Sequence, residues 1–110
     1  MTDLHKQTLS LLAYLFLRHD RLDHAAILYQ ALHRLYPEDA VYAASLAYVR
    51  LEQGDHAGAL DMVVSAGRLA SGPLASGLEL IRARALHGLD QKDEAWKAMR
   101  RIIIDAGGRG

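Results

Sequence analysis

Histidine is the residue type of this chain best suited to chemistry at neutral pH, as a general base or as a metal ligand. The chain has six histidines, and none lies three or four residues from another, the helical spacing that puts two ligands on one face. Cysteine is absent, which excludes thiolate ligands, disulfides and a cysteine nucleophile. No Gly-rich phosphate loop is present, and serine, histidine and acidic residues have no spacing that links them. We therefore expect no catalytic site, no metal and no cofactor.

Tyrosine and leucine residues at a fixed spacing offer a different chemistry, the binding of an apolar protein segment. Tyr14 and Tyr48 are thirty-four residues apart, and Leu17 and Leu51 have the same separation. Residues that recur at such a distance occupy the same place in successive structural repeats, whose stacked surfaces bind other proteins. The repeat must therefore be established before these side chains can be placed.

Alanine marks the repeat. Ala59 follows Ala25 by thirty-four residues, and Ala95 follows Ala59 by thirty-six, with the two extra residues falling in the turn at 71–73. A turn absorbs such an insertion at little cost. Thirty-four residues is the length of the tetratricopeptide unit, a helix–turn–helix hairpin. Small residues also recur in the first helix of each copy, where two helices must approach closely: Ala13, Ala47 and Ala83.

The first helix of this unit follows a pattern of a large residue, a leucine, a small residue and a large residue. The first copy has this pattern from Leu9 to Phe16, but the third departs from it at Glu79 and Arg82. The third hairpin is therefore either a true repeat or a solvated end cap. We expect six residues to fill the space between helices: Leu12, Ala13, Phe16, Leu46, Ala47 and Val49.

The predicted fold class is all-α, with three tetratricopeptide-type helical hairpins stacked as a short right-handed solenoid. A single domain spans 1–106, with repeats at about 6–39, 40–73 and 76–106, and residues 107–110 form a flexible tail. The predicted helices are 5–18, 22–36, 40–53, 56–70, 73–87 and 91–105. Helix caps and turn residues support these bounds, with Asp20 or Asp23, Asp39, Asp55 and Asp90 at helix starts, Gly54 and Gly88 at left-handed ends, and Pro73 in a first turn.

The first helices of stacked hairpins line a concave face, which is where such arrays bind peptides. The inward positions of the first copy include Gln7 and Ser10. A carboxylate clamp is disfavoured because Arg84 alone among the inward residues can hold a carboxylate. The alternative for the tyrosine and leucine rows is core packing. We predict nine partner-binding residues on this face: Tyr14, Leu17, Val41, Ala44, Tyr48, Leu51, Leu80, Arg84 and His87.

Charge and hydropathy limit the classes of partner. Thirteen basic residues balance thirteen acidic ones, which argues against nucleic acid and against an anionic membrane surface. The apolar run 9–17 is far shorter than the ~20 residues of a membrane span, and it lacks the cleavage site of a signal peptide. We read it as part of a buried helix. The expected location is the cytoplasm, without membrane insertion.

The stretch from Leu9 to Leu60 resembles the small tetratricopeptide chaperones of bacterial type III secretion systems. The resemblance rests on the chain length, the three repeats and two segments: Ala25, Ile27, Leu28, Tyr29, Leu32, Leu35 and Pro37, then Gly54, Asp55 and Ala59. Within that group the longer class, which binds translocators, is similar to SycD and LcrH. The shorter class, similar to YscY and YscG, holds an early export substrate or a needle subunit, and the length here favours it.

This resemblance implies a bacterial cytoplasmic chaperone that holds an apolar or helical segment of a small secretion-system protein in its groove before export. The client would be a needle subunit, an early export substrate or a translocator, and a homodimer could form when the client is absent. The alternative is a generic tetratricopeptide adaptor or a homo-oligomeric scaffold without a secreted client. A regulatory domain of a larger enzyme complex is a third reading that the residues neither favour nor oppose.

Overall fold

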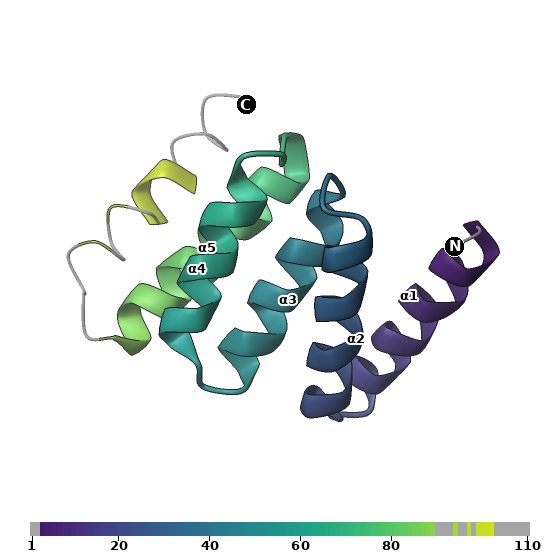
Figure 1. Cartoon of the computed structure of the whole chain (residues 1–110). Helices are drawn as coiled ribbons and strands as arrows, with labels where there is room; N and C mark the ends of the chain where they lie inside the picture. Colours follow the sequence, from purple (N-terminus) through teal and green to yellow (C-terminus); the bar gives the residue numbers. More distant parts are fainter. Residues whose placement is uncertain (1–2, 90–93, 95–96, 98, 103–110) are drawn as a thin grey trace.

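Five helices form most of the protein, and they follow one another as antiparallel neighbours (Figure 1). They are α1 (Asp3–Arg18), α2 (Leu22–Leu35), α3 (Ala40–Glu52), α4 (His56–Gly67) and α5 (Gly72–Gly88). This computed structural model describes residues 3–89, 94, 97 and 99–102, and the last six of these are helical as well. No strand occurs in this part of the chain, so the all-α class is confirmed.

The five helices match the predicted ones to within three residues at each end. The sixth predicted helix is described only in part, and the small residue of the third copy, Ala95, lies outside the described residues. So do Asp90 and the predicted tail at 107–110. Among the described residues, no helix combines the length and the apolar character that crossing a bilayer requires.

Aspartate caps start α3 and α4, as predicted. The Asp39 carboxylate accepts a hydrogen bond from the backbone amide of Val41 at 3.1 Å, and Asp55 accepts one from Gly58 at 2.9 Å. Each cap satisfies an amide that has no partner within its helix. Gly54 lies between α3 and α4 with φ +82°, the left-handed conformation predicted for it.

The start of α2 corrects the prediction of an aspartate cap at Asp20 or Asp23. The residue before α2 is Arg21, and its side chain makes no capping hydrogen bond. Asp20 instead turns the chain from α1 into α2 with φ +58°, a conformation that a short polar side chain tolerates. Asp23 lies inside the first turn of α2 and accepts a hydrogen bond from Gln53 at 2.9 Å, which ties α2 to the end of α3.

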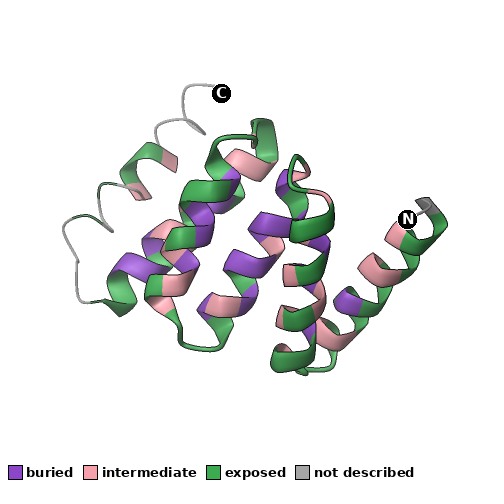
Figure 2. Cartoon of the chain, viewed as in Figure 1, coloured by how far each residue is buried: buried purple, intermediate pink, exposed green. Residues whose placement is uncertain are grey.

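The core lies between the facing sides of the helices, where Figure 2 shows the buried residues. The central helix is α3, which packs against α2, α4 and α5 and carries eight buried residues. Small side chains allow this close packing. The predicted alanines are buried, in agreement with the repeat pattern: Ala13, Ala25, Ala47, Ala59 and Ala83.

Leu12 is exposed and does not fill the space between helices that the first-helix pattern predicted for it. It points about 100° around α1 from the buried Ala13.

Glu79 and Arg82, the two departures from the first-helix pattern in the third copy, interact with each other. These two side chains form an ion pair at 3.8 Å on α5, and Arg101 approaches the same Glu79 carboxylate at 3.9 Å. The helical residues 99–102 therefore reach the polar side of α5.

Gly88 is the last helical residue of α5 and does not adopt the left-handed conformation predicted for it. A Cβ atom placed on this residue would overlap the imidazole of His56, which begins α4. The glycine therefore allows the end of α5 to approach the start of α4.

This contact predicts an inverted effect of a normally favourable substitution. Alanine is a better helix former than glycine, yet we expect Gly88→Ala to lower the free energy of unfolding by about 1–3 kcal/mol because the new methyl group overpacks against His56. In a His56→Ala background the same change should be neutral or stabilising. Urea denaturation followed by circular dichroism measures all four proteins, and an equal cost of Gly88→Ala in both backgrounds would contradict the contact.

Candidate functional site

An apolar hollow lies between α3 and α5. Its volume is about 370 Å³, and its wall consists almost entirely of apolar atoms. Helix α3 supplies one side and α5 the other, while α1 contributes a single residue. The lining residues are Leu17, Val41, Ala44, Ser45, Tyr48, Leu74, Gly77, Leu78, Leu80, Ile81 and Arg84.

Two further hollows continue this one along the helices. A more polar hollow of about 490 Å³ shares Val41 and Leu74 with it, at the start of α3 and α5. A hollow of about 280 Å³ shares Arg84 with it, at the opposite end. Adjacent hollows have lining residues in common, and we call the three together the α3–α5 furrow. Its floor follows α3, whose thirteen residues extend over about 20 Å.

Six of the nine predicted partner-binding residues line the central hollow: Leu17, Val41, Ala44, Tyr48, Leu80 and Arg84. Leu51 and His87 line the end hollow, together with His56. Tyr14 lines none of the three hollows. The structure thus brings most of the predicted residues to one surface, and Tyr14 does not line it although it precedes Leu17 by three residues on α1.

Leu51 is a core residue, which corrects its prediction as an open anchor for a partner. Only 6% of its surface is exposed, and it packs in a cluster with Ala59 and Ala85. The cause is α5, which packs against α3 and covers the side chain that the repeat pattern placed on the open face. Leu51 therefore supports the floor of the furrow. Ala44 is also buried, although it still contributes to the hollow.

Tyr14 and Tyr48 do not form the predicted row. Tyr48 is 38% exposed and lines the hollow, whereas Tyr14 is 47% exposed and has its own partner on α1. The Arg18 guanidinium lies 5.9 Å from the centre of the Tyr14 ring and donates a hydrogen bond to the Tyr14 hydroxyl at 3.2 Å. Helix α1 reaches α3 at another point, the 2.7 Å hydrogen bond between Ser10 and Tyr42.

The α5 side of the hollow includes three residues that the repeat pattern did not identify: Leu74, Leu78 and Ile81. They recur at intervals of four and three residues, the spacing of one helix face. The sequence shows this periodicity. It does not show that the face borders a hollow, because the same spacing is expected of a core face, and Leu78 is indeed buried in the main core.

Ion pairs stand at both ends of the furrow. Arg84 pairs with Glu52 of α3 at 3.2 Å, so a carboxylate ligand would have to displace Glu52. At the other end Lys6 pairs with Asp39 at 3.1 Å, and its ammonium lies 4.8 Å from the centre of the Tyr36 ring. The hydrogen bond with Asp39 raises the pKa of Lys6. Each end is therefore polar, and Glu38 adds a negative charge at the end that holds Lys6 and Asp39.

A buried tyrosine lies behind the furrow. Burial raises the pKa of Tyr29, while a hydrogen bond with Ser45 opposes the shift. Ser45 lines the central hollow, and Tyr29 belongs to the core on the α2 side. This contact keeps the hydroxyl of Tyr29 satisfied below a wall that is otherwise apolar.

The geometry suits the binding of an apolar segment. Within the described residues, no group of three or more histidine, aspartate and glutamate side chains is placed to hold a metal ion. Comparison with known proteins finds no family model that matches the chain and no curated protein that is significantly similar to it. The furrow is therefore the feature that bears on the function of this protein.

Proposed function

We propose that this protein is a tetratricopeptide-type binding module that holds an apolar or helical segment of a partner protein in the α3–α5 furrow. The observation that carries this proposal is an apolar hollow between α3 and α5, with an ion pair near each end of the furrow. A partner helix that places apolar residues at i, i+3, i+4 and i+7 matches such a furrow. A bound helix of about 20 Å would comprise about 13 residues.

The helix arrangement supports the repeat assignment. The pairs α1–α2 and α3–α4 pack as hairpins, and α3 also packs against α5, the first helix of the next predicted unit. In a stacked array of hairpins each unit contacts its neighbours in this way. The buried alanines Ala25 and Ala59 occupy equivalent places in α2 and α4.

We further propose that the partner is a small type III secretion component, held in the bacterial cytoplasm before export. The support is the resemblance of Leu9 to Leu60 to the small chaperones of these systems, together with the apolar hollow between α3 and α5. The resemblance implies a needle subunit, an early export substrate or a translocator as the partner.

Co-expression tests the secretion assignment. The chain is purified alone and after co-expression with each small protein encoded beside its gene, and the mass of each sample is measured by light scattering after size exclusion. We expect one neighbour to form a heterocomplex of defined mass. If the chain binds none of these co-expressed proteins and is a monomer or a symmetric oligomer, the secretion assignment is overturned in favour of a generic scaffold.

A charge at Tyr48 tests the furrow, and a charge on α4 is the control. We expect Tyr48→Glu to weaken binding of the co-expressed partner at least ~100-fold, because the new carboxylate would be buried against an apolar ligand. Val64→Glu introduces the same charge on an exposed position of α4 that lines none of the three hollows, and it should change the affinity less than about threefold. Titration calorimetry measures both, with circular dichroism to verify helicity. Equal losses in the two variants would rule out the furrow as the binding site.

A further inference from the structure

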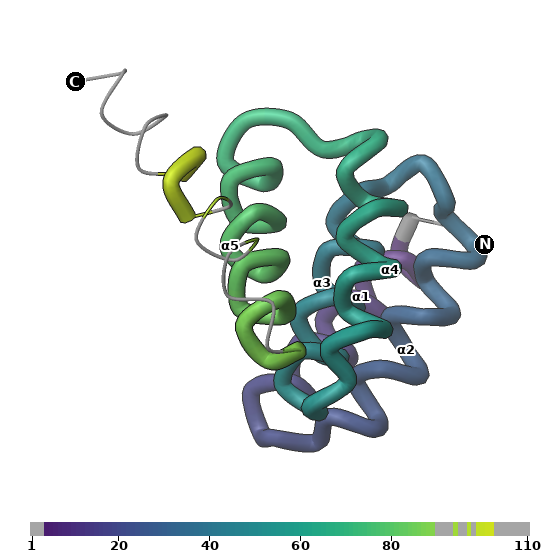
Figure 3. The backbone as a smooth tube through the Cα atoms, turned by 90° about the vertical axis from the view of Figure 1, so that its left-hand side faces the viewer, coloured from purple at the N-terminus to yellow at the C-terminus, as the bar shows by residue number. Residues whose placement is uncertain are grey.

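The side chains that line the two ends of the α3–α5 furrow differ in charge. Figure 3 shows α5 beside α3, the two helices that border the furrow. The hollow at the start of α3 is lined by one cation, Lys6, and by two carboxylates, Glu38 and Asp39. The hollow at the opposite end is lined by the guanidinium of Arg84 and by two histidines. A ligand that spans the furrow therefore meets an excess of carboxylates at one end, an apolar centre and a guanidinium at the other end.

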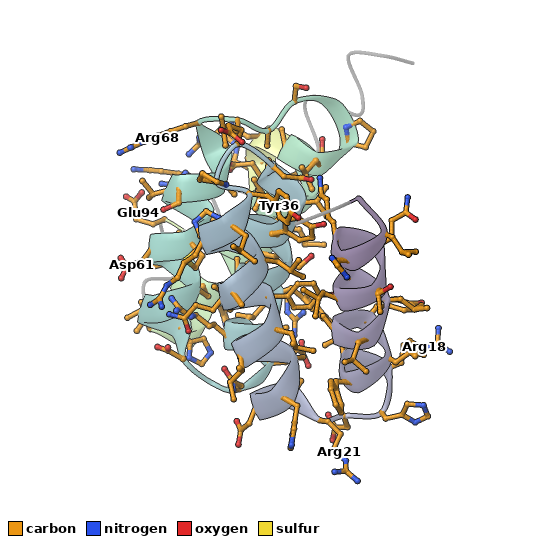
Figure 4. The ribbon with its side chains drawn as sticks, turned by 45° about the vertical axis from the view of Figure 1, so that its right-hand side comes forward. Arg18, Arg21, Tyr36, Asp61, Arg68 and Glu94 are labelled. Atoms are coloured by element: carbon orange, nitrogen blue, oxygen red, sulfur yellow. The ribbon has the colours of Figure 1, made fainter. Side chains whose placement is uncertain are left out.

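The acidic end already accommodates an ammonium group, that of Lys6. Its nitrogen lies 3.1 Å from the Asp39 carboxylate, 4.8 Å from the centre of the Tyr36 ring and 5.6 Å from that of the Tyr42 ring. Aromatic faces attract cations at such distances. Tyr36 follows the last residue of α2, where Figure 4 labels it. Within the described part of the chain Glu38 forms no ion pair, so a second cation would balance the charge at this end.

The opposite end presents Arg84 to a ligand. Arg84 pairs with Glu52, which does not line the hollow, and this contact uses one guanidinium nitrogen, Nη2, at 3.2 Å. The Arg84 side chain is 55% exposed. A partner carboxylate would therefore compete with Glu52 for an accessible guanidinium. His56 and His87 line the same hollow, and their ring nitrogens are possible hydrogen-bond donors to that carboxylate.

We propose that the partner segment carries a basic side chain at one end and an acidic side chain at the other, with apolar residues between them. This inference rests on the proposed function and adds the chemistry of the ligand. The basic side chain lies beside Glu38 and Asp39, and the acidic side chain lies beside Arg84. Such a ligand is complementary to both ends of the furrow, whereas a ligand with like charges at its two ends is repelled at one of them.

The length of the furrow sets the spacing of the two charges. Ala40 lines the hollow at the acidic end, and Leu51 lines the hollow at the opposite end. The rise along α3 between these two residues is about 17 Å. On a partner helix, residues i and i+11 are separated by the same rise and lie about 20° apart around the axis, so both face the furrow. The expected pattern is a basic and an acidic residue at i and i+11, in either order, with apolar residues at i+4 and i+7 on the same face.

Three synthetic helical peptides test the charge pattern. They share leucine at i+4, i+7 and i+8 in an alanine-rich background and differ at i and i+11, which are lysine and glutamate, two lysines or two glutamates. We expect the lysine–glutamate peptide to bind the wild-type chain about tenfold more tightly than either like-charge peptide at low salt. In ~1 M NaCl the difference should fall below about twofold, because salt screens exposed charges. Fluorescence anisotropy of labelled peptides measures the affinities.

A charge reversal at Glu38 tests where the basic side chain binds. With Glu38→Lys, cations outnumber carboxylates among the lining residues at both ends, so the peptide with two glutamates should become the tightest ligand. Asp61→Lys is the matched control, because Asp61 is exposed on α4 and lines none of the three hollows. This variant should keep the wild-type order of affinities. Circular dichroism verifies that both variants retain their helicity.

The outcomes distinguish this inference from the proposed function. If the three peptides bind the wild-type chain with equal affinity, or if Asp61→Lys changes the order of affinities as Glu38→Lys does, the charge pattern is overturned and the furrow remains a binding site for apolar helices. If none of the three peptides binds at either salt concentration, the proposed function is overturned, and this inference is overturned with it.

Discussion

Replacing Gly77 with leucine is expected to block the α3–α5 furrow while making the protein more stable. Gly77 lies inside α5 and lines the central hollow, and a Cβ atom built on it meets no other atom within 4 Å. A Cβ atom is therefore accommodated at this position, and we expect the rest of a leucine side chain to occupy the hollow. Leucine also forms helices better than glycine by about 0.5–1 kcal/mol, which should appear as a gain in the free energy of unfolding.

The expected loss of partner affinity in Gly77→Leu is at least ~100-fold, because the leucine occupies the volume that a partner side chain would fill. Gly67→Leu is the matched control. Gly67 is also helical and also has open space around its Cβ position, but it ends α4 outside the furrow. Calorimetric titration with the co-expressed partner and urea denaturation measure the two effects. A Gly77→Leu protein that is well folded and binds normally would contradict the furrow assignment.

Truncating Leu32 is expected to cause the largest loss of stability among single leucine changes in α2. Leu32 is completely buried in the main core, together with residues from α1, α3 and α4. Leu32→Ala removes a packed side chain and leaves a cavity, which lowers the free energy of unfolding by about 2–5 kcal/mol. A chain of this size has a total stability of about 5–15 kcal/mol, so a large share would be lost.

Leu35→Ala is the control for Leu32→Ala. Leu35 lies three residues further along the same helix and is 50% exposed, so its truncation should cost less than about 1 kcal/mol. Urea denaturation followed by circular dichroism gives both values. Similar costs at the two positions would mean that α2 does not contribute the core face seen in the structure.

The sequence by itself determined the helices and the repeat spacing. Helix bounds depend on interactions within a few residues, such as the caps at Asp39 and Asp55, so local patterns predicted them. The buried alanines were predictable for a related reason. A small side chain at a fixed period is needed wherever two helices approach closely, and Ala25 and Ala59 are completely buried.

The composition of the candidate site was predictable only in part. Val41 and Tyr48 line the α3–α5 furrow together because they are seven residues apart, which places both on one face of α3. Tyr14 occupies the equivalent place in α1 but lies outside the furrow. Equivalent positions in a repeat lead to equivalent surroundings only when both neighbours of the repeat are present.

Tertiary structure alone decided which apolar residues are covered. Leu51 and Leu11 both belong to amphipathic helices, yet α5 buries the first, and no described helix covers the second. The periodicity of one helix gives the direction of a side chain, but the element in that direction comes from a distant part of the sequence. The position of α5 against α3 therefore determined the furrow.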